Sequence, residues 1–260
     1  MSNINQKKIV LVIGGHDPSG GAGIQADIES IIHAGCHPVT VITSLTTQNT
    51  REVVDINPQN PETFRRQIRL IMDDMHIDAC KIGMFGDTGL IDVVCDELLD
   101  KDIPIILDPV IRSGSGTTLA DEQVCHALIK RLFPLTTLIT PNSEEARILS
   151  NEKDLTIAAS TLLQYGTNAV LITGTHEESE DVVNTLYLKD RNIYKYNWQR
   201  LPETYHGSGC TLSSSIAAYL AQGEGLKSAV EKAQNYTWET LQNGIKLGHG
   251  QILPNRFFDK

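Results

Sequence analysis

The sequence has few cysteines and aromatic residues, and it contains no long hydrophobic run. Its five cysteines are widely spaced and form no CxxC pair, so neither a disulfide framework nor a zinc site is expected. The apolar run at residues 9–13 follows a polar start and is too short for a signal peptide or a membrane span. These absences predict a soluble, cytoplasmic protein with reduced thiols and no membrane partner.

Positive charge is also scarce. The chain has 22 Lys and Arg against 32 Asp and Glu, a formal charge of −10, and no basic block that could displace counterions from nucleic acid. Nucleic acid is therefore not an expected partner, whereas a local phosphate site needs only a few aimed donors. The 260 residues, 40% of them apolar, predict one globular domain over 1–260.

Apolar runs and helical periodicities alternate along the chain. A strand at 9–13 leads into a glycine loop, and a helix follows because isoleucines recur at helical spacing from Ile24. A hairpin closed by Asp190 and Arg191 should join strands at 184–189 and 192–198. The pattern predicts an α/β fold with a mostly parallel sheet between two helical layers and an antiparallel edge. The other expected strands are 39–43, 79–82, 103–107, 137–140 and 169–173, and the other helices are 62–75, 87–100, 121–132, 154–165, 210–222 and 226–243.

Two glycine-rich segments are candidates for ligand binding. Residues 14–23 hold five glycines and could bring backbone N–H groups close to a ligand, although the segment is neither a Walker A loop nor GxGxxG. Residues 206–211, HGSGCT, precede a predicted helix and could form an anion pocket. There the helix dipole should lower the pKa of Cys210, which suggests a thiolate base or a polar contact. The alternatives are an ordinary turn and a small buried cysteine.

Carboxylate and amide side chains follow two predicted strands. Asn142 and Glu145 come after the strand at 137–140 and could approach a hydrated Mg²⁺, which needs only one or two carboxylates. The alternative is an ordinary capped helix with Asn142 or Ser143 at its N-cap. Asp108 ends the strand at 103–107, and its alternative role is strand termination before Pro109.

Together and in this order, the motifs resemble the ribokinase-like superfamily, specifically the hydroxymethylpyrimidine/phosphomethylpyrimidine kinase family of thiamine biosynthesis. The resemblance covers nearly the whole chain and implies a three-layer α/β/α ribokinase-like fold, ATP and Mg²⁺ as cofactors, and a homodimer. The motifs are DPSGGAGIQAD at 17–27, QNT at 48–50, KIGM at 81–84, DPV at 108–110, TPN at 140–142 and HGSGCT at 206–211.

The resemblance also implies a role for individual residues. Gln48 would bind the aminopyrimidine, since a carboxamide can donate and accept along one edge of the ring, and Cys210 would face the hydroxyl acceptor. Glu145 would hold Mg²⁺ through water together with Asn142. The remaining implied residues are Gly14, Asp27, Met84 and Val110 in the substrate pocket, Gly207, Ser208 and Gly209 in the anion hole, and Asp108, Asn142, Thr173 and Thr211 around the nucleotide.

Two lysines that are common in the family are absent here. Gly114 and Thr173 stand at their places, which bears on the second phosphorylation more than on the kinase assignment. Arg112 could replace one of the two cations. The leading hypothesis is ATP-dependent phosphorylation of 4-amino-5-hydroxymethyl-2-methylpyrimidine and then of its monophosphate. The alternatives are a pyridoxal or pyridoxine kinase, and a non-catalytic pyrimidine sensor on the same scaffold.

Overall fold

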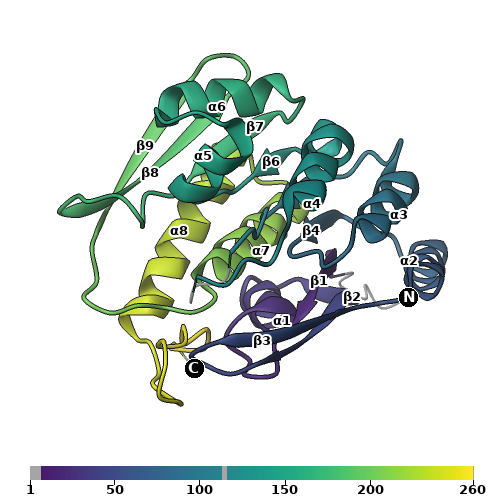
Figure 1. The fold of residues 1–260 in the computed structure, drawn as a ribbon, viewed down its shortest axis with the longest axis horizontal. Helices are drawn as coiled ribbons and strands as arrows, with labels where there is room; N and C mark the ends of the chain where they lie inside the picture. Colours follow the sequence, from purple (N-terminus) through teal and green to yellow (C-terminus); the bar gives the residue numbers. More distant parts are fainter. Residues whose placement is uncertain (1–6, 113–115, 260) are drawn as a thin grey trace, which may run out of the picture.

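The computed structural model describes residues 7–112 and 116–259, and a nine-stranded sheet forms its centre (Figure 1). The strand order is β3-β2-β1-β4-β5-β6-β7-β8-β9. The six strands from β2 to β7 in this order are parallel, while β3 at one edge and β8 and β9 at the other are antiparallel. The strands are β1 (Ile9–His16), β2 (His37–Gln48), β3 (Val53–Pro58), β4 (Ala79–Ile82), β5 (Ile105–Leu107), β6 (Leu138–Ile139), β7 (Ala169–Ile172), β8 (Asp181–Leu188) and β9 (Ile193–Gln199).

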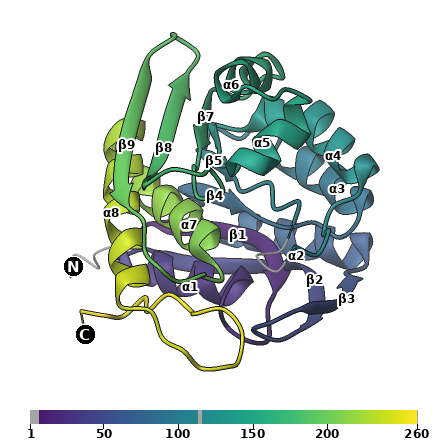
Figure 2. The ribbon, with the colours of Figure 1, turned by 60° about the vertical axis from the view of Figure 1, so that its left-hand side comes forward.

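Helices cover both faces of the sheet (Figure 2). Side chains alternate between the faces along a strand, so Val10 and Val12 belong to one apolar cluster and Leu11 and Ile13 to the other. The first cluster packs under α1 (Gly23–His33), α7 (Ser208–Ala221) and α8 (Leu226–Gln242). The second packs under α2 (Pro61–Asp74), α3 (Thr88–Leu98), α4 (Glu122–Ala127), α5 (Ser143–Ser150) and α6 (Leu155–Gln164).

The helices differ in how they begin. On the second face, Asn60, Asp87, Asp121, Asn142 and Asp154 each cap a helix with a side-chain oxygen that accepts backbone N–H bonds, as N-cap residues do. On the first face, α1 and α7 begin without a side-chain cap. Their first N–H groups are therefore available to other partners.

The three-layer α/β/α fold with a mostly parallel sheet and an antiparallel edge is confirmed, and so is the hairpin with Arg191 in the left-handed region at φ 70°. Two local predictions were incomplete. Strand β3 was missed because its side chains are mostly exposed and give no apolar run. The expected helix at 121–132 is instead α4 followed by a π-helical turn, Leu128–Leu132, and a 3₁₀ turn, Phe133–Leu135.

The carboxyl ends of the parallel strands meet at one edge of the sheet. Strand β1 lies between β2 and β4, so the chain order reverses there, which is where ligands bind in open α/β sheets. The glycine loop, Met84, Asp108, Asn142 and Thr173 all follow strands at this edge. Among the described residues, no helix has both the length and the apolar character needed to cross a membrane.

Candidate active site

The two glycine-rich segments are in direct contact. Gly207 has a φ of +88°, and a Cβ atom there would collide with the carbonyl oxygen of Gly21. A Cβ atom at Gly21 would in turn collide with the ring of His206. Glycine is required at both positions because only a bare backbone fits. The contact fixes the uncapped N-terminus of α7 against the loop after β1. The anion hole predicted at Gly207, Ser208 and Gly209 therefore lies where backbone N–H groups have no side-chain cap and could accept an anion.

Cys210 lies in the first turn of α7 and is partly exposed. Burial raises the pKa of its thiol to about 12, although the nearby Lys81 opposes this. The sequence predicts that the helix dipole lowers this pKa, and that prediction is wrong because desolvation of the thiolate outweighs the dipole. Cys210 is therefore a neutral thiol at pH 7 and can donate a weak hydrogen bond.

A buried ion pair lies under the site. Lys81 Nζ on β4 contacts Asp27 Oδ1 on α1 at 2.7 Å, and the two side chains are 1% and 0% exposed. The Ser214 hydroxyl on α7 donates to the same oxygen at 2.6 Å. Asp27 Oδ2 is buried and has no hydrogen-bond partner in the described part of the chain. The pair ties three elements together and leaves one carboxylate oxygen for a ligand.

Three of the predicted substrate residues lie together. A Cβ atom at Gly14 would lie 3.6 Å from Asp27 Oδ2, and one at Gly15 would lie 2.7 Å from the methyl group of Met84. Met84 is positioned in turn by Thr43, whose hydroxyl donates to its carbonyl at 2.7 Å. Val110 lies after β5, where its N–H donates to the Asp108 carbonyl at 2.9 Å.

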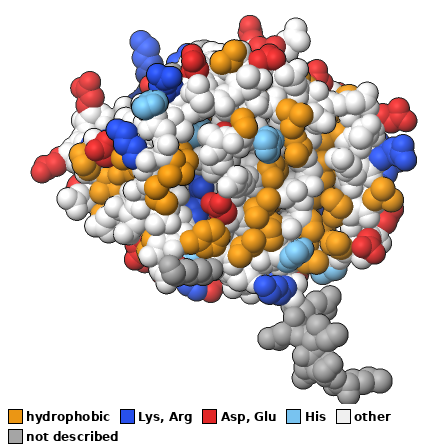
Figure 3. All heavy atoms as spheres, turned by 90° about the horizontal axis from the view of Figure 1, so that it is seen from below, with side chains coloured by type: hydrophobic (Ala, Val, Ile, Leu, Met, Phe, Trp, Pro, Cys, Tyr) orange, Lys and Arg blue, Asp and Glu red, His pale blue; other side chains and the backbone are white. Residues whose placement is uncertain are grey.

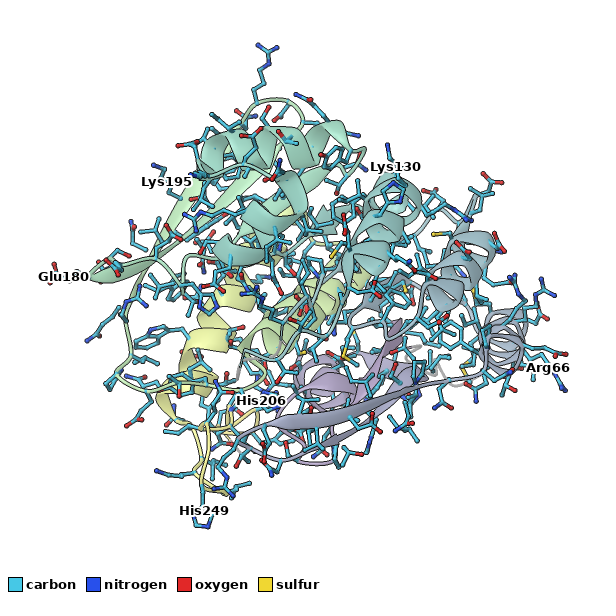
Figure 4. All side chains as sticks on the ribbon, viewed as in Figure 1. Arg66, Lys130, Glu180, Lys195, His206 and His249 are labelled. Atoms are coloured by element: carbon cyan, nitrogen blue, oxygen red, sulfur yellow. The ribbon has the colours of Figure 1, made fainter. Side chains whose placement is uncertain are left out.

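Gln48 ends strand β2, and its Nε2 lies 3.5 Å from Nε2 of His206. His206 lies near the β2–β3 hairpin and the C-terminal segment (Figure 4). Because His206 also packs against Gly21, Gln48 is beside the glycine loop.

Asp108 lies close to the first turn of α7. A Cβ atom at Gly209 would lie 3.3 Å from Asp108 Oδ2, so the carboxyl group borders the anion site. Burial raises the pKa of Asp108 to about 6, and Lys81 partly offsets this. A cation bound nearby would favour the ionised form.

Asn142 and Glu145 form the capping box of α5, which was the alternative reading of this motif. Asn142 Oδ1 accepts from the Glu145 N–H at 2.9 Å, and Glu145 Oε2 accepts from the Asn142 N–H at 3.0 Å. Glu145 Oε1 accepts from the Ile111 N–H at 3.0 Å. Burial, and after it the charge of Asp108, raise the pKa of Glu145 to about 8.

This geometry is compatible with a magnesium ion held through water. Within residues 7–112 and 116–259, no group of three or more His, Cys, Asp or Glu side chains could hold a metal directly. Mg²⁺ retains several waters and takes oxygen ligands, and two carboxyl groups, Asp108 and Glu145, are buried here. The charge of Asp108 contributes to the raised pKa of Glu145, and a hydrated cation nearby would offset that charge, so the residues fit the ion.

The remaining predicted nucleotide residues have different positions. Thr173 pairs with the end of β6, since its N–H donates to Pro141 and its carbonyl accepts from Ser143, both at 3.0 Å. Thr211 is fully buried, and its hydroxyl donates to the Gly207 carbonyl at 2.9 Å. These bonds give Thr211 a supporting role in the first turn of α7, and its contact with the nucleotide stays a prediction. Gly114 lies outside the described residues.

Sequence reasoning assigned no role to Arg256, which is 2% exposed and joins the two glycine segments. Its guanidinium donates to Gly21 O at 2.6 Å, Thr211 Oγ1 at 2.9 Å and Glu29 Oε2 at 3.1 Å. The sequence near the C-terminus contains no pattern that predicts this contact. Lys81 was quoted in a motif without a role, although a lysine inside a buried strand requires a carboxylate partner.

An anion site at a helix N-terminus, facing a glycine loop and flanked by carboxylates at the ends of parallel strands, defines a small-molecule kinase of the ribokinase-like class. The family model described as phosphomethylpyrimidine kinase matches residues 17–255. The chain is 38% identical to the hydroxymethylpyrimidine/phosphomethylpyrimidine kinase of Haemophilus influenzae, over 99% of this chain and 98% of that protein. The chain therefore belongs to the phosphomethylpyrimidine kinase family.

Solved structures of two kinases resemble the fold. The phosphomethylpyrimidine kinase of Clostridium difficile is 34% identical, with a TM-score of 0.80 over 90% of this chain and 100% of that chain. A pyridoxal kinase of Bacillus subtilis, solved as an ADP complex, is 28% identical, with a TM-score of 0.88 over 96% of this chain and 98% of that chain. Both substrate classes thus occur on this fold, so the fold alone does not separate them.

Proposed function

We propose that this protein transfers the γ-phosphoryl group of ATP to the hydroxymethyl group of 4-amino-5-hydroxymethyl-2-methylpyrimidine and then to the resulting monophosphate. Family membership supports this, and so do the names of relatives that are 35–38% identical over at least 93% of this chain. The observation that carries the proposal is the position of the α7 N-terminus. It faces the glycine loop, with Cys210 near the Lys81–Asp27 pair and Gln48 beside the same loop.

The site residues divide the work of phosphoryl transfer. The amides of Ser208, Gly209 and Cys210 stabilise charge on the equatorial oxygens of the transferring group. Cys210 orients the acceptor hydroxyl as a neutral thiol. As the new P–O bond forms and the bond to the ADP leaving group breaks, the hydroxyl proton can pass late to an oxygen of the transferred phosphoryl group, so a strong base is unnecessary where the transition state is loose.

The pocket and the cation site supply binding and charge balance. Asp27 Oδ2 accepts a hydrogen bond from the substrate, Gln48 contacts the pyrimidine edge, and Gly14, Met84 and Val110 surround the ring. Asp108, Asn142 and Thr173 face the nucleotide, and Glu145 with Asn142 would hold hydrated Mg²⁺. That ion would neutralise charge on the ATP phosphates.

Product analysis by mass spectrometry tests the function and separates it from its alternatives. The protein would be incubated with Mg·ATP and either the free pyrimidine or pyridoxine, and added phosphates would be counted. We expect one and then two phosphates on the pyrimidine, with a much lower kcat/KM for pyridoxine. Phosphorylation of pyridoxine alone would assign the rival kinase activity. Binding of the pyrimidine without any product would assign the sensor.

We further propose that residues 1–260 act as one kinase domain and form a cytoplasmic homodimer. The unpaired cysteines support a reducing compartment.

The face that carries the β2–β3 hairpin exposes hydrophobic side chains (Figure 3), among them Leu45 and Val54, as interfaces often do. Light scattering on Val54→Asp should show a monomer. The control Ile157→Asp changes an exposed residue of α6 and should remain a dimer. A monomeric wild type would refute the dimer.

A further inference from the structure

The polar atoms of Asp17, His206 and Gln48 converge beside the glycine loop. Asp17 is 4% exposed, and its carboxylate accepts from the Ser19 N–H at 2.8 Å, the Ala22 N–H at 2.9 Å and His206 Nε2 at 2.8 Å. Burial by itself raises the pKa of Asp17, but hydrogen bonds from His206, Ser19 and Gln48 outweigh it and hold the pKa well below its usual value. Asp17 is thus an ionised carboxylate that only accepts hydrogen bonds.

The charge of Asp17 decides the orientation of both neighbours. His206 Nε2 must carry the proton that it donates to Asp17 Oδ2, so it has no lone pair for the Gln48 amide nitrogen 3.5 Å away. The Gln48 amide presents its Nε2 atom to the Asp17–His206 pair, and the ionised carboxylate favours this orientation because it attracts the NH₂ group and repels the carbonyl oxygen. The Gln48 Oε1 atom and its second N–H therefore face away from Asp17.

This orientation gives Gln48 a defined recognition pattern. We propose that Asp17 and His206 are positioning residues that fix the Gln48 carboxamide for an aminopyrimidine edge, an inference that rests on the proposed function. Oε1 then accepts from the ring amino group while the free N–H donates to the adjacent ring nitrogen. A flipped amide would place its NH₂ group against the amino group of the substrate, and two donors facing each other lose both bonds.

His206 is itself held rigidly enough to act in this way. Its backbone N–H donates to the Ile252 carbonyl at 2.9 Å, and its ring packs against Gly21. The end of β2 is fixed as well, since the Thr46 hydroxyl donates to the His16 carbonyl at 2.8 Å. The three side chains therefore come from segments with fixed backbones, which gives the amide one preferred orientation.

The experiment compares two substrates, the 4-aminopyrimidine and its analogue with hydrogen in place of the amino group. Wild-type enzyme should prefer the amino compound by about 10-fold or more in kcat/KM. In Asp17→Asn the new carboxamide offers both a donor and an acceptor to Gln48, so the Gln48 amide no longer has one fixed orientation. The preference for the amino compound in kcat/KM should then fall about 10-fold. His206→Leu removes the N–H that holds the Asp17 carboxylate in place, so the variant should lose the preference for the amino compound. His206→Gln keeps a donor for Asp17 and should retain most of that preference. KM for ATP should change little in all three variants.

Each outcome decides the proposal. An equal loss on both substrates would reduce Asp17 and His206 to structural residues, and unchanged preference in every variant would also overturn the inference. Adding Gln48→Ala to Asp17→Asn should cause no further loss of preference if Asp17 acts through Gln48. If Asp17→Asn does not fold, the His206→Leu and His206→Gln pair gives the same comparison. A folded wild type that phosphorylates neither pyrimidine would refute the proposed function instead.

Discussion

The buried Lys81–Asp27 pair predicts a large effect on stability. Lys81→Met removes the ammonium but keeps most of the side-chain volume, and within the described part of the chain it leaves the carboxylate of Asp27 with only the Ser214 hydroxyl as a donor. Breaking one side of a buried pair costs about 3–5 kcal/mol, a large part of a total stability of about 5–15 kcal/mol. Burial opposes the charge of Lys81, but Asp27 outweighs it and raises the pKa of the lysine. The contribution should therefore be fully present below the unfolded lysine pKa and be lost as the pH rises through the folded pKa.

Urea unfolding followed by circular dichroism measures this cost. Lys8→Met is the matched control, because Lys8 contacts Asp78 at the same 2.7 Å but is 51% exposed, and it should cost less than about 1 kcal/mol. The double variant Asp27→Asn with Lys81→Met removes both charges and should be more stable than the sum of the single changes predicts. A Lys81→Met protein within about 1 kcal/mol of wild type, or strictly additive costs, would refute the reasoning.

Three further predictions concern the site. Cys210→Ala should lower kcat about 10-fold with little change in KM for ATP, since a neutral thiol contributes one hydrogen bond, whereas a loss of about 10²-fold or more would indicate a general base. Gln48→Ala should cost about 1–3 kcal/mol in kcat/KM for the pyrimidine, and an effect on ATP alone would place the pocket elsewhere. Arg256→Ala should lower both Tm and kcat because the link between Gly21 and Thr211 is lost, and Arg256→Lys should give intermediate values. Equal kcat in the wild type and both variants would contradict the positioning role of Arg256.

The sheet could be predicted well because its parallel strands are buried on both faces. Such strands appear as apolar runs, and β4 was predicted with both ends correct. Strand β3 gave no such run because most of its side chains are exposed, and it is stabilised by antiparallel pairing with β2. Its pairing depends on a neighbour that a local pattern cannot reveal.

The site could be predicted only in part, because motifs identify residues but not their contacts. The structure brings Gly14, Asp27 and Met84 together as expected. The direction of the Cys210 pKa shift was predicted wrongly because burial in the folded chain, which a local sequence pattern does not reveal, dominates that pKa. Arg256 was missed for a similar reason, since its partners lie between 45 and 235 residues away.

The cations near Thr173 are the basis for a prediction about the second phosphorylation. Arg147 pairs with both carboxylate oxygens of Glu177 at 2.7 and 2.9 Å. Arg200 donates to the carbonyl oxygens of Thr175, Glu177 and Ser179. Both arginines thus hold the loop after Thr173 in place, and their donors are already engaged.

A monophosphate acceptor carries about two negative charges at neutral pH, and these repel the ATP γ-phosphate strongly where water is excluded. The α7 amides support the transferring group equally in both steps, whereas an additional lysine would help most when the acceptor itself is charged. With threonine at 173 and the arginines engaged, the first step should be the faster one. In a time course from the free pyrimidine, the monophosphate should accumulate before the diphosphate, and Thr173→Lys should shorten that lag. Diphosphate that forms without visible monophosphate, or a higher kcat/KM for the monophosphate, would show that another group supplies the missing charge.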